Sequence, residues 1–146
     1  MKRLVAVLAL LLIAGCASQR TAIADPEITI AQLSSTPTIA EHVTGGMPVH
    51  FRLTVTNTAQ FPITLKRSEL QSIGTGGYDV APAAHPFNLV IAPGATESVE
   101  FWVPANASTS VAGANGAVAL RVTTEYDSPS GGFQSVQVRQ VMGRIN

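Results

Sequence analysis

Hydrophobic and polar residues alternate along most of this chain beyond Pro26. The clearest run spans residues 49–56, where valine, phenylalanine, leucine and valine are separated by histidine, arginine and threonine. Successive side chains of a β-strand point to opposite sides of its sheet, so this period of two predicts a strand with one buried and one solvated face.

Other predicted strands follow the same logic, and turn residues separate them. The Ala92–Gly94 and Asp127–Gly132 segments have the composition of turns, and the second predicts a β-hairpin. Pro62 indicates a strand start or an edge position, because proline has no N–H to donate. No segment has the period of an amphipathic helix, so we predict an all-β fold, an antiparallel β-sandwich of about 7–8 strands. The other predicted strands are 28–31, 61–66, 86–91, 98–103, 118–126 and 135–142, whereas 34–47 and 105–116 are predicted loops.

The N-terminal segment has a different pattern. Lys2 and Arg3 precede an unbroken apolar run from Leu4 to Ala14, and Gly15 and Cys16 follow it. A membrane-spanning helix needs about 20 apolar residues, so this segment is too short to be one and instead has the outline of a secretory signal.

The run Leu-Ile-Ala-Gly-Cys that ends at Cys16 closely resembles the lipobox of bacterial lipoproteins. This resemblance implies that Cys16 is lipidated and becomes the first residue of the mature chain. An ordinary secretory signal with an incidental cysteine is the alternative. Ala17, where aspartate would stand in a retained protein, resembles lipoproteins sorted to the outer membrane, so we expect a lipid-anchored envelope protein facing the periplasm.

These patterns divide the chain into three parts. Residues 1–15 are the predicted lipoprotein signal peptide, 16–25 the lipidated cysteine and its tether, and 26–146 the β-sandwich domain. The nine tether residues after the cysteine reach about 30 Å when extended, which predicts a domain close to the membrane surface.

Charge and cysteine content exclude several classes of function. The chain has 9 basic and 9 acidic residues, and the basic ones are scattered, so we expect no nucleic acid partner. Its single cysteine allows no disulfide within the domain and no thiolate metal site.

The sandwich portion carries a second, weaker resemblance. Asn57 closes a predicted strand before Phe61–Leu65, and Ile91–Gly94 leads into another strand at Thr96. These features resemble the late-embryogenesis-abundant type 2 (WHy-like) domain, and they also occur in immunoglobulin-like domains of bacterial envelope proteins. Both resemblances imply a sandwich, and the first implies protection under water stress.

Few residues suggest catalysis. His50 lies on the polar face of a predicted strand, while His42 and His85 lie in predicted loops. No His-Glu-x-x-His, Gly-x-Ser-x-Gly or phosphate-binding glycine motif is present. We therefore predict a non-enzymatic protein with no catalytic residues and no cofactor.

Acidic residues near predicted turns are candidate calcium ligands. Glu125 and Asp127 flank the last turn, and Asp79 lies in another. Calcium requires about six to eight convergent oxygen atoms, and no Asp-x-Asn-x-Asp series is present. We therefore expect no metal site and assign Asp127 to turn capping.

Trp102 is the residue that we single out for partner binding. Strand parity places it opposite Phe101 and Val103, so its side chain is predicted to face outward. An exposed tryptophan can anchor a partner, unless a loop such as 105–116 covers it.

We therefore expect a membrane-anchored envelope lipoprotein whose β-sandwich is an immunoglobulin-like domain with a scaffolding or protein-binding role. Its expected partners are the membrane and another envelope protein. Strand addition at a sheet edge is one way of binding such a partner. A stress-protective protein and a hydrolase of envelope polymers are the alternatives.

Overall fold

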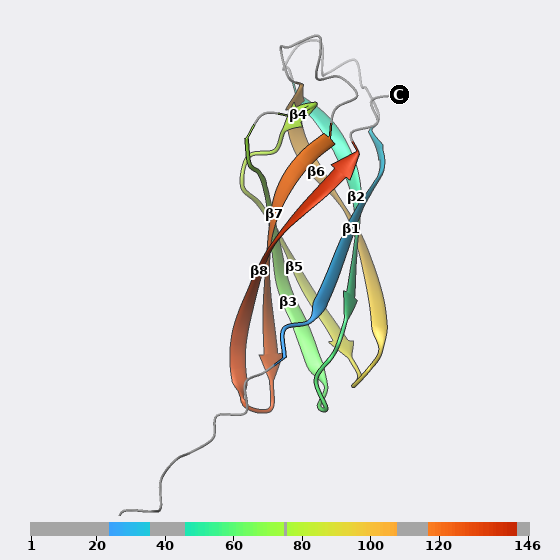
Figure 1. The fold of residues 1–146 in the computed structure, drawn as a ribbon, viewed down its shortest axis with the longest axis vertical. Coiled ribbons are helices and arrows are strands. Elements are labelled where there is room, and N and C mark those ends of the chain that lie inside the picture. The colour runs from blue at the N-terminus through green and yellow to red at the C-terminus, as the bar shows by residue number, and fades with distance from the viewer. Residues whose placement is uncertain (1–23, 36–45, 75, 108–116, 143–146) are drawn as a thin grey trace, which may run out of the picture.

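The computed structural model describes residues 24–35, 46–74, 76–107 and 117–142. They form eight strands in two four-stranded antiparallel sheets that pack face to face (Figure 1). The prediction of an all-β antiparallel sandwich is confirmed. The strands are β1 (Glu27–Ser35), β2 (Gly46–Thr56), β3 (Ile63–Ser72), β4 (Tyr78–Asp79), β5 (Ala83–Ile91), β6 (Thr96–Ala107), β7 (Ala117–Ser128) and β8 (Gly131–Met142).

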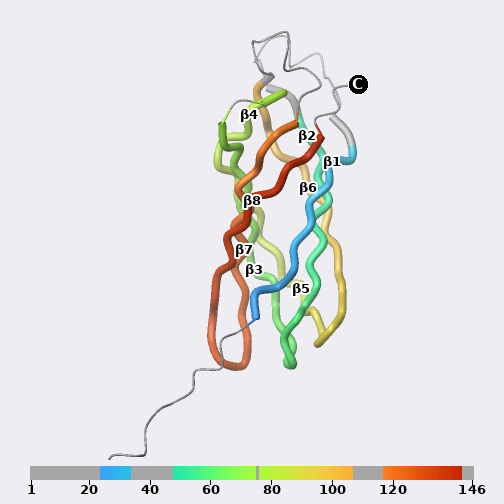
Figure 2. The backbone as a smooth tube through the Cα atoms, in the orientation of Figure 1, coloured from blue at the N-terminus to red at the C-terminus, as the bar shows by residue number. Residues whose placement is uncertain are grey.

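The chain passes back and forth between the two sheets along the sequence. One sheet has the order β1-β2-β6-β4 and the other β5-β3-β7-β8, so the chain crosses between them after β2, β3, β4, β5 and β6. The tube in Figure 2 follows this path. β7 and β8 form the predicted hairpin, with only Pro129 and Ser130 between the two strands. Pro62 lies just before β3, which agrees with the predicted strand start.

Several predicted boundaries were wrong. Parts of the predicted loops are strand ends, because β1 reaches Ser35, β2 begins at Gly46 and β6 extends to Ala107. β3 continues to Ser72, beyond the predicted end, and its register shifts between Leu65 and Arg67. At such a bulge the inward and outward positions change parity, so a search for strict alternation ends the strand too early.

The core lies between the sheets and is built from the inward positions of the strands. In β2 these are the apolar residues of the alternating run that predicted the strand, and all four are almost fully buried. β7 contributes a matching inward row from the other sheet. The inward residues of these two strands are Val49, Phe51, Leu53, Val55, Val118, Leu120, Val122, Thr124 and Tyr126.

Two side chains of β8 join the sheets at one side of the sandwich. Arg139 Nε donates to the carbonyl oxygen of Ile28 at 2.9 Å, and Gln137 Nε2 donates to that of Pro26 at 3.0 Å. β1 is an edge strand, so these carbonyls have no neighbouring strand in their own sheet. Arg139 and Gln137 therefore cap the edge of β1.

Asn57 holds one end of the sandwich together. Its amide is fully buried and donates to the carbonyl oxygens of Phe61, Ile91 and Ala92 at 2.8–3.2 Å. Its Oδ1 accepts from the N–H of Ala59 at 2.9 Å. This one side chain thus connects the β2–β3 turn to the β5–β6 turn.

Two buried tyrosines give opposite predictions for removal of their hydroxyls. The Tyr126 hydroxyl makes no hydrogen bond of normal geometry to a described residue, because the nearby Thr124 hydroxyl donates to the carbonyl oxygen of Ser135. Burial raises the Tyr126 pKa to about 12, and the proximity of Thr124 offsets only part of this rise. The Tyr78 hydroxyl donates to Gln32 Oε1 at 2.8 Å. We expect Tyr126→Phe to leave the free energy of unfolding unchanged or raise it by up to about 1 kcal/mol, and Tyr78→Phe to lower it by about 1 kcal/mol. Urea denaturation measures both, and a larger loss for Tyr126→Phe would contradict the assignment.

Candidate functional site

The outer face of the β1-β2-β6-β4 sheet carries the only tryptophan of the chain. Outward residues of β2 and β6 lie opposite each other in four consecutive cross-strand pairs. We call this surface the Trp102 face. Its pairs are His50 with Trp102, Arg52 with Glu100, Thr54 with Ser98, and Thr56 with Thr96.

Trp102 is exposed, and its ring stacks on a neighbouring side chain. It is 45% exposed, as its strand parity predicted. Its ring stacks on His50, with ring centroids 4.4 Å apart and planes within 9° of parallel. One face of the indole is therefore covered by the imidazole. The other face points away from β2, toward the outer side of β6.

Glu100 lies beside the stacked rings and contacts both Arg52 and His50. Its Oε1 accepts from Arg52 Nε at 2.9 Å and from Arg52 Nη2 at 2.6 Å. Its Oε2 lies 3.3 Å from His50 Nε2. Glu100 therefore lies against both Arg52 and His50, and these contacts favour the observed stacking of the imidazole on the indole.

Hydroxyl groups continue the Trp102 face toward the other end of the sheet. Thr54 and Ser98 share a hydrogen bond of 2.8 Å, and so do Thr56 and Thr96. The face is polar there and has no net charge, since the charges of Arg52 and Glu100 offset each other.

The other two histidines do not belong to this face. His85, predicted to lie in a loop, lies instead on β5 and points inward, 4.7 Å from the ring of Phe101. Partial burial lowers the His85 pKa from its ordinary value. The prediction was wrong because the strand begins before Pro86, at Ala83. His42 lies outside the described residues.

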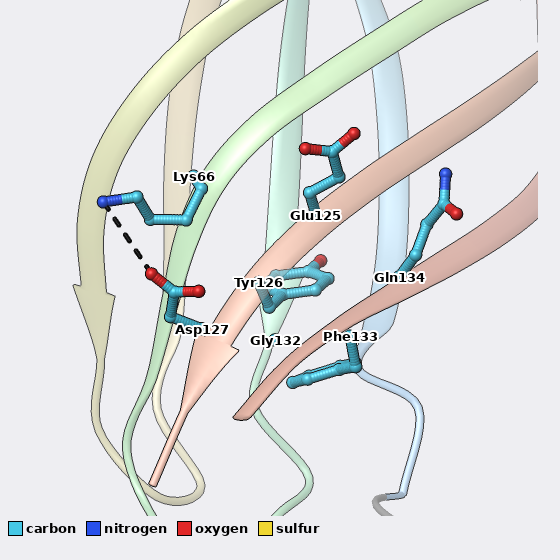
Figure 3. A pocket seen from close by; sticks show the side chains of 7 residues that line it. All are labelled: Lys66, Glu125, Tyr126, Asp127, Gly132, Phe133 and Gln134. Carbon is cyan, nitrogen blue, oxygen red and sulfur yellow. Dashed lines mark ion pairs between the residues drawn. The ribbon is translucent and has the colours of Figure 1, made fainter. Parts of the chain in front are cut away.

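A shallow hollow of about 440 Å³ lies at the hairpin end of the second sheet (Figure 3). Tyr126 and Phe133 form its apolar part, and their rings stack with centroids 5.1 Å apart. Lys66 and Asp127 approach each other across it, with Nζ and Oδ2 3.9 Å apart. Its charged groups are thus already paired, and it presents no nucleophile beside a base. It is lined by Lys66, Glu125, Tyr126, Asp127, Gly132, Phe133 and Gln134.

The carboxylates considered for calcium bind other protein groups. Glu125 lies 3.9 Å from an Arg67 guanidinium nitrogen, and Asp79 accepts a hydrogen bond from Ser72. Within the described ranges no three histidine, cysteine, aspartate or glutamate side chains are grouped to hold a metal ion.

The sequence prediction placed Trp102 and His50 on the outward face of their strands, but it missed the contacts of Arg52 and Glu100. Their pairing depends on the register of β2 against β6, which alternation alone does not determine. Cys16 and most of the tether lie outside the described residues. In the part of the chain that the structure describes, no helix has the length and apolar character needed to cross a bilayer.

The fold places this chain among small antiparallel β-sandwich proteins. No protein-family model and no curated protein sequence matches the chain. Solved structures of low sequence identity share its fold, and this likeness concerns the architecture alone.

One of these is a structural-genomics target with a TM-score of 0.55 and 10% identity, over 82% of this chain and 85% of the other. The second, a protein from Archaeoglobus fulgidus, has a TM-score of 0.53 and 14% identity, over 84% and 100%. The third, the putative ApaA protein from Bordetella pertussis, has a TM-score of 0.52 and 14% identity, over 83% and 97%.

Proposed function

We propose that this chain is a non-enzymatic lipoprotein of the bacterial cell envelope, anchored through Cys16, that binds another envelope protein through the Trp102 face. The observation that carries the binding role is the exposed indole of Trp102, stacked on His50, which Glu100 contacts. Rigid exposed aromatics are favoured as binding anchors, because little side-chain entropy is lost when a partner docks.

The anchoring half of the proposal rests on the sequence around Cys16. A diacylglyceryl group with an added N-acyl chain gives stable membrane attachment, whereas one chain gives only marginal attachment. The membrane would then hold the sandwich near its surface, on a tether about 30 Å long.

The stress-protection alternative gains no support from the residues on which the resemblance depends. Asn57, which carries much of it, is fully occupied in holding two turns together. The proposal therefore keeps binding ahead of protection.

Lipid labelling tests the anchor. The full-length chain should incorporate an alkyne-labelled palmitate and sediment with membranes, and Cys16→Ser should lose both properties. Ser18→Ala, two residues away, serves as the matched control and should behave as wild type. Membrane attachment of Cys16→Ser, or an unlabelled wild-type chain, would refute the anchor.

Site-directed capture tests the binding role. Full-length protein crosslinked in intact cells should retain one envelope protein, identified by mass spectrometry, and Trp102→Ala should reduce its recovery about tenfold or more. Val136→Ala removes an exposed apolar side chain from the other sheet and is the control. Equal recovery with Trp102→Ala would refute this role for the face.

A further inference from the structure

We propose that the outer edge of β6, at Ser98, Glu100 and Trp102, accepts an extended segment of the partner protein as an added antiparallel strand. This inference rests on the proposed function and deepens it, because it specifies the conformation of the partner and the edge to which it binds. Three features of the structure carry it.

The first feature is a pair of facing prolines that determines which way the backbone of β6 points. Pro48 of β2 lies opposite Pro104 of β6. Neither residue has an N–H, so theirs cannot be a hydrogen-bonded pair, and the hydrogen-bonded pairs are the neighbouring ones at Val103, Phe101 and Val99. Peptide groups of a strand alternate in direction, so those of Ser98, Glu100 and Trp102 point away from β2.

No described strand meets these outward-pointing groups. β4 lies on that side of β6, but it pairs only with Asn106 and Ala107. The edge at the other side of the same sheet is different, because Arg139 binds the carbonyl group of Ile28 in β1 and Gln137 that of Pro26 just before it. The β6 edge thus keeps donors and acceptors at strand spacing, which is what an added strand requires.

The second feature is the position of side chains on both faces of that edge. On the outer face, the side of the Trp102 ring that is turned away from His50 is directed toward the place that an added strand would occupy. On the inner face, His85, Phe87 and Leu89 of the neighbouring β5 are only half-buried. An added strand would therefore place alternate side chains against the indole and against this half-buried row.

The third feature is the charge of the surroundings. Glu100 is the acidic side chain on the outer face of the edge, and Arg52 offsets it. Glu97 is also exposed on β6, but it has the opposite strand parity and so does not lie on the outer face. A charged outward residue on the added strand would therefore find no unpaired charge of opposite sign on this face. The segment that fits best alternates apolar inward residues with neutral outward ones.

A model peptide tests the inference directly. The probe is a ten-residue peptide with four Val-Thr pairs between terminal lysines, added to the full-length protein in detergent micelles. Trp102 is the only tryptophan, so its fluorescence reports occupancy of the edge. We expect a saturable blue shift, because the added strand removes water from the exposed indole face.

N-methylation of the probe provides a matched control. Residues that form hydrogen-bonded antiparallel pairs have side chains on the same face. The backbone N–H and C=O groups of the outward threonines should therefore bond to those of Ser98, Glu100 and Trp102. N-methylation of the threonines should abolish the shift, and N-methylation of the valines should preserve it. The opposite ranking, or equal effects, would overturn the inference.

A pair of protein variants tests the same edge from the other side. Ser98→Pro removes an outward N–H without removing a β2–β6 ladder bond and should weaken peptide binding about tenfold. Ser98→Ala keeps that N–H and should bind within about twofold of wild type. If Ser98→Pro does not fold, a photo-crosslinker at position 98 should label the peptide and one at Thr29, on the opposite edge strand, should not.

The outcomes separate this inference from the proposed function. If Trp102→Ala loses the envelope protein while Ser98→Pro keeps it, the face binds by another mode and strand addition is wrong. If neither variant loses the protein, the proposed function fails as well. A fluorescence shift with chitooligosaccharide but none with the peptide would also overturn strand addition, since it would identify the ligand as a glycan.

Discussion

Replacing Asn57 by aspartate is expected to destabilise the fold by about 5 kcal/mol at neutral pH, more than any surface change considered above. The Asn57 amide nitrogen lies 2.8–3.2 Å from three carbonyl oxygens in a fully buried site. A carboxylate would place negative charge against these oxygens and could not donate to them. Asn57→Ala should cost less, about 3 kcal/mol, because it removes the hydrogen bonds without burying a charge.

The pH dependence of Asn57→Asp provides a second test. Burial and the facing carbonyl groups raise the pKa of the introduced carboxyl in the folded state above its unfolded value of about 3.9. The extra destabilisation should therefore be absent below that value and grow as the pH rises toward the folded pKa. Thr58→Ala, at the exposed next position, is the control and should change stability by less than about 0.5 kcal/mol.

Chemical denaturation followed by circular dichroism measures these differences. If Asn57→Asp matched Asn57→Ala at every pH, the buried carboxylate would carry no extra cost and the expected effect of the facing carbonyl groups would be wrong.

Replacing Phe51 by alanine should lower the free energy of unfolding by about 3–5 kcal/mol, the usual cost of a large cavity in a core. Phe51 is fully buried at the middle of β2, with its ring centroid 6.5 Å from that of Phe101. Urea unfolding of the two proteins gives the difference.

Trp102→Ala is the matched control for Phe51→Ala. Trp102 follows Phe101 in β6, but it faces outward and is 45% exposed. Its loss should cost about 1 kcal/mol or less, because it removes one stack on His50 and creates no cavity. Equal costs for the two substitutions would contradict the assignment of core and surface faces.

The sequence predicted the fold class because apolar residues at every second position of a strand are the residues that become buried. In β2 each apolar residue of the alternating run is buried, and in β6 the parity of Phe101 correctly placed Trp102 on the outside. The β7–β8 hairpin was predictable for a related reason, since its turn residues have strong local preferences.

The remainder depends on relations between strands that lie far apart in the sequence. The bulge of β3 between Leu65 and Arg67 interrupts the alternation, so the second half of that strand was missed. The two residues of β4 are too few to show a period. His85 was misplaced because Pro86 interrupts an otherwise readable strand.

The candidate site was only partly predictable for the same reason. Strand parity gives the face on which a residue lies but not its partner in the next strand. The contacts of Glu100 with Arg52 and His50, and the facing prolines that orient the β6 edge, follow from one β2–β6 register. That register becomes known only when the strands are paired in three dimensions.

The capped edge of β1 also has a mechanical consequence. A pull on residue 25 would enter the domain at the first residues of β1, close to the carbonyls that Gln137 and Arg139 hold. The load would divide between the ladder to β2 in one sheet and these two side chains from the other. Tension at the N-terminal end is therefore shared by both layers of the sandwich and does not simply peel away its outermost strand.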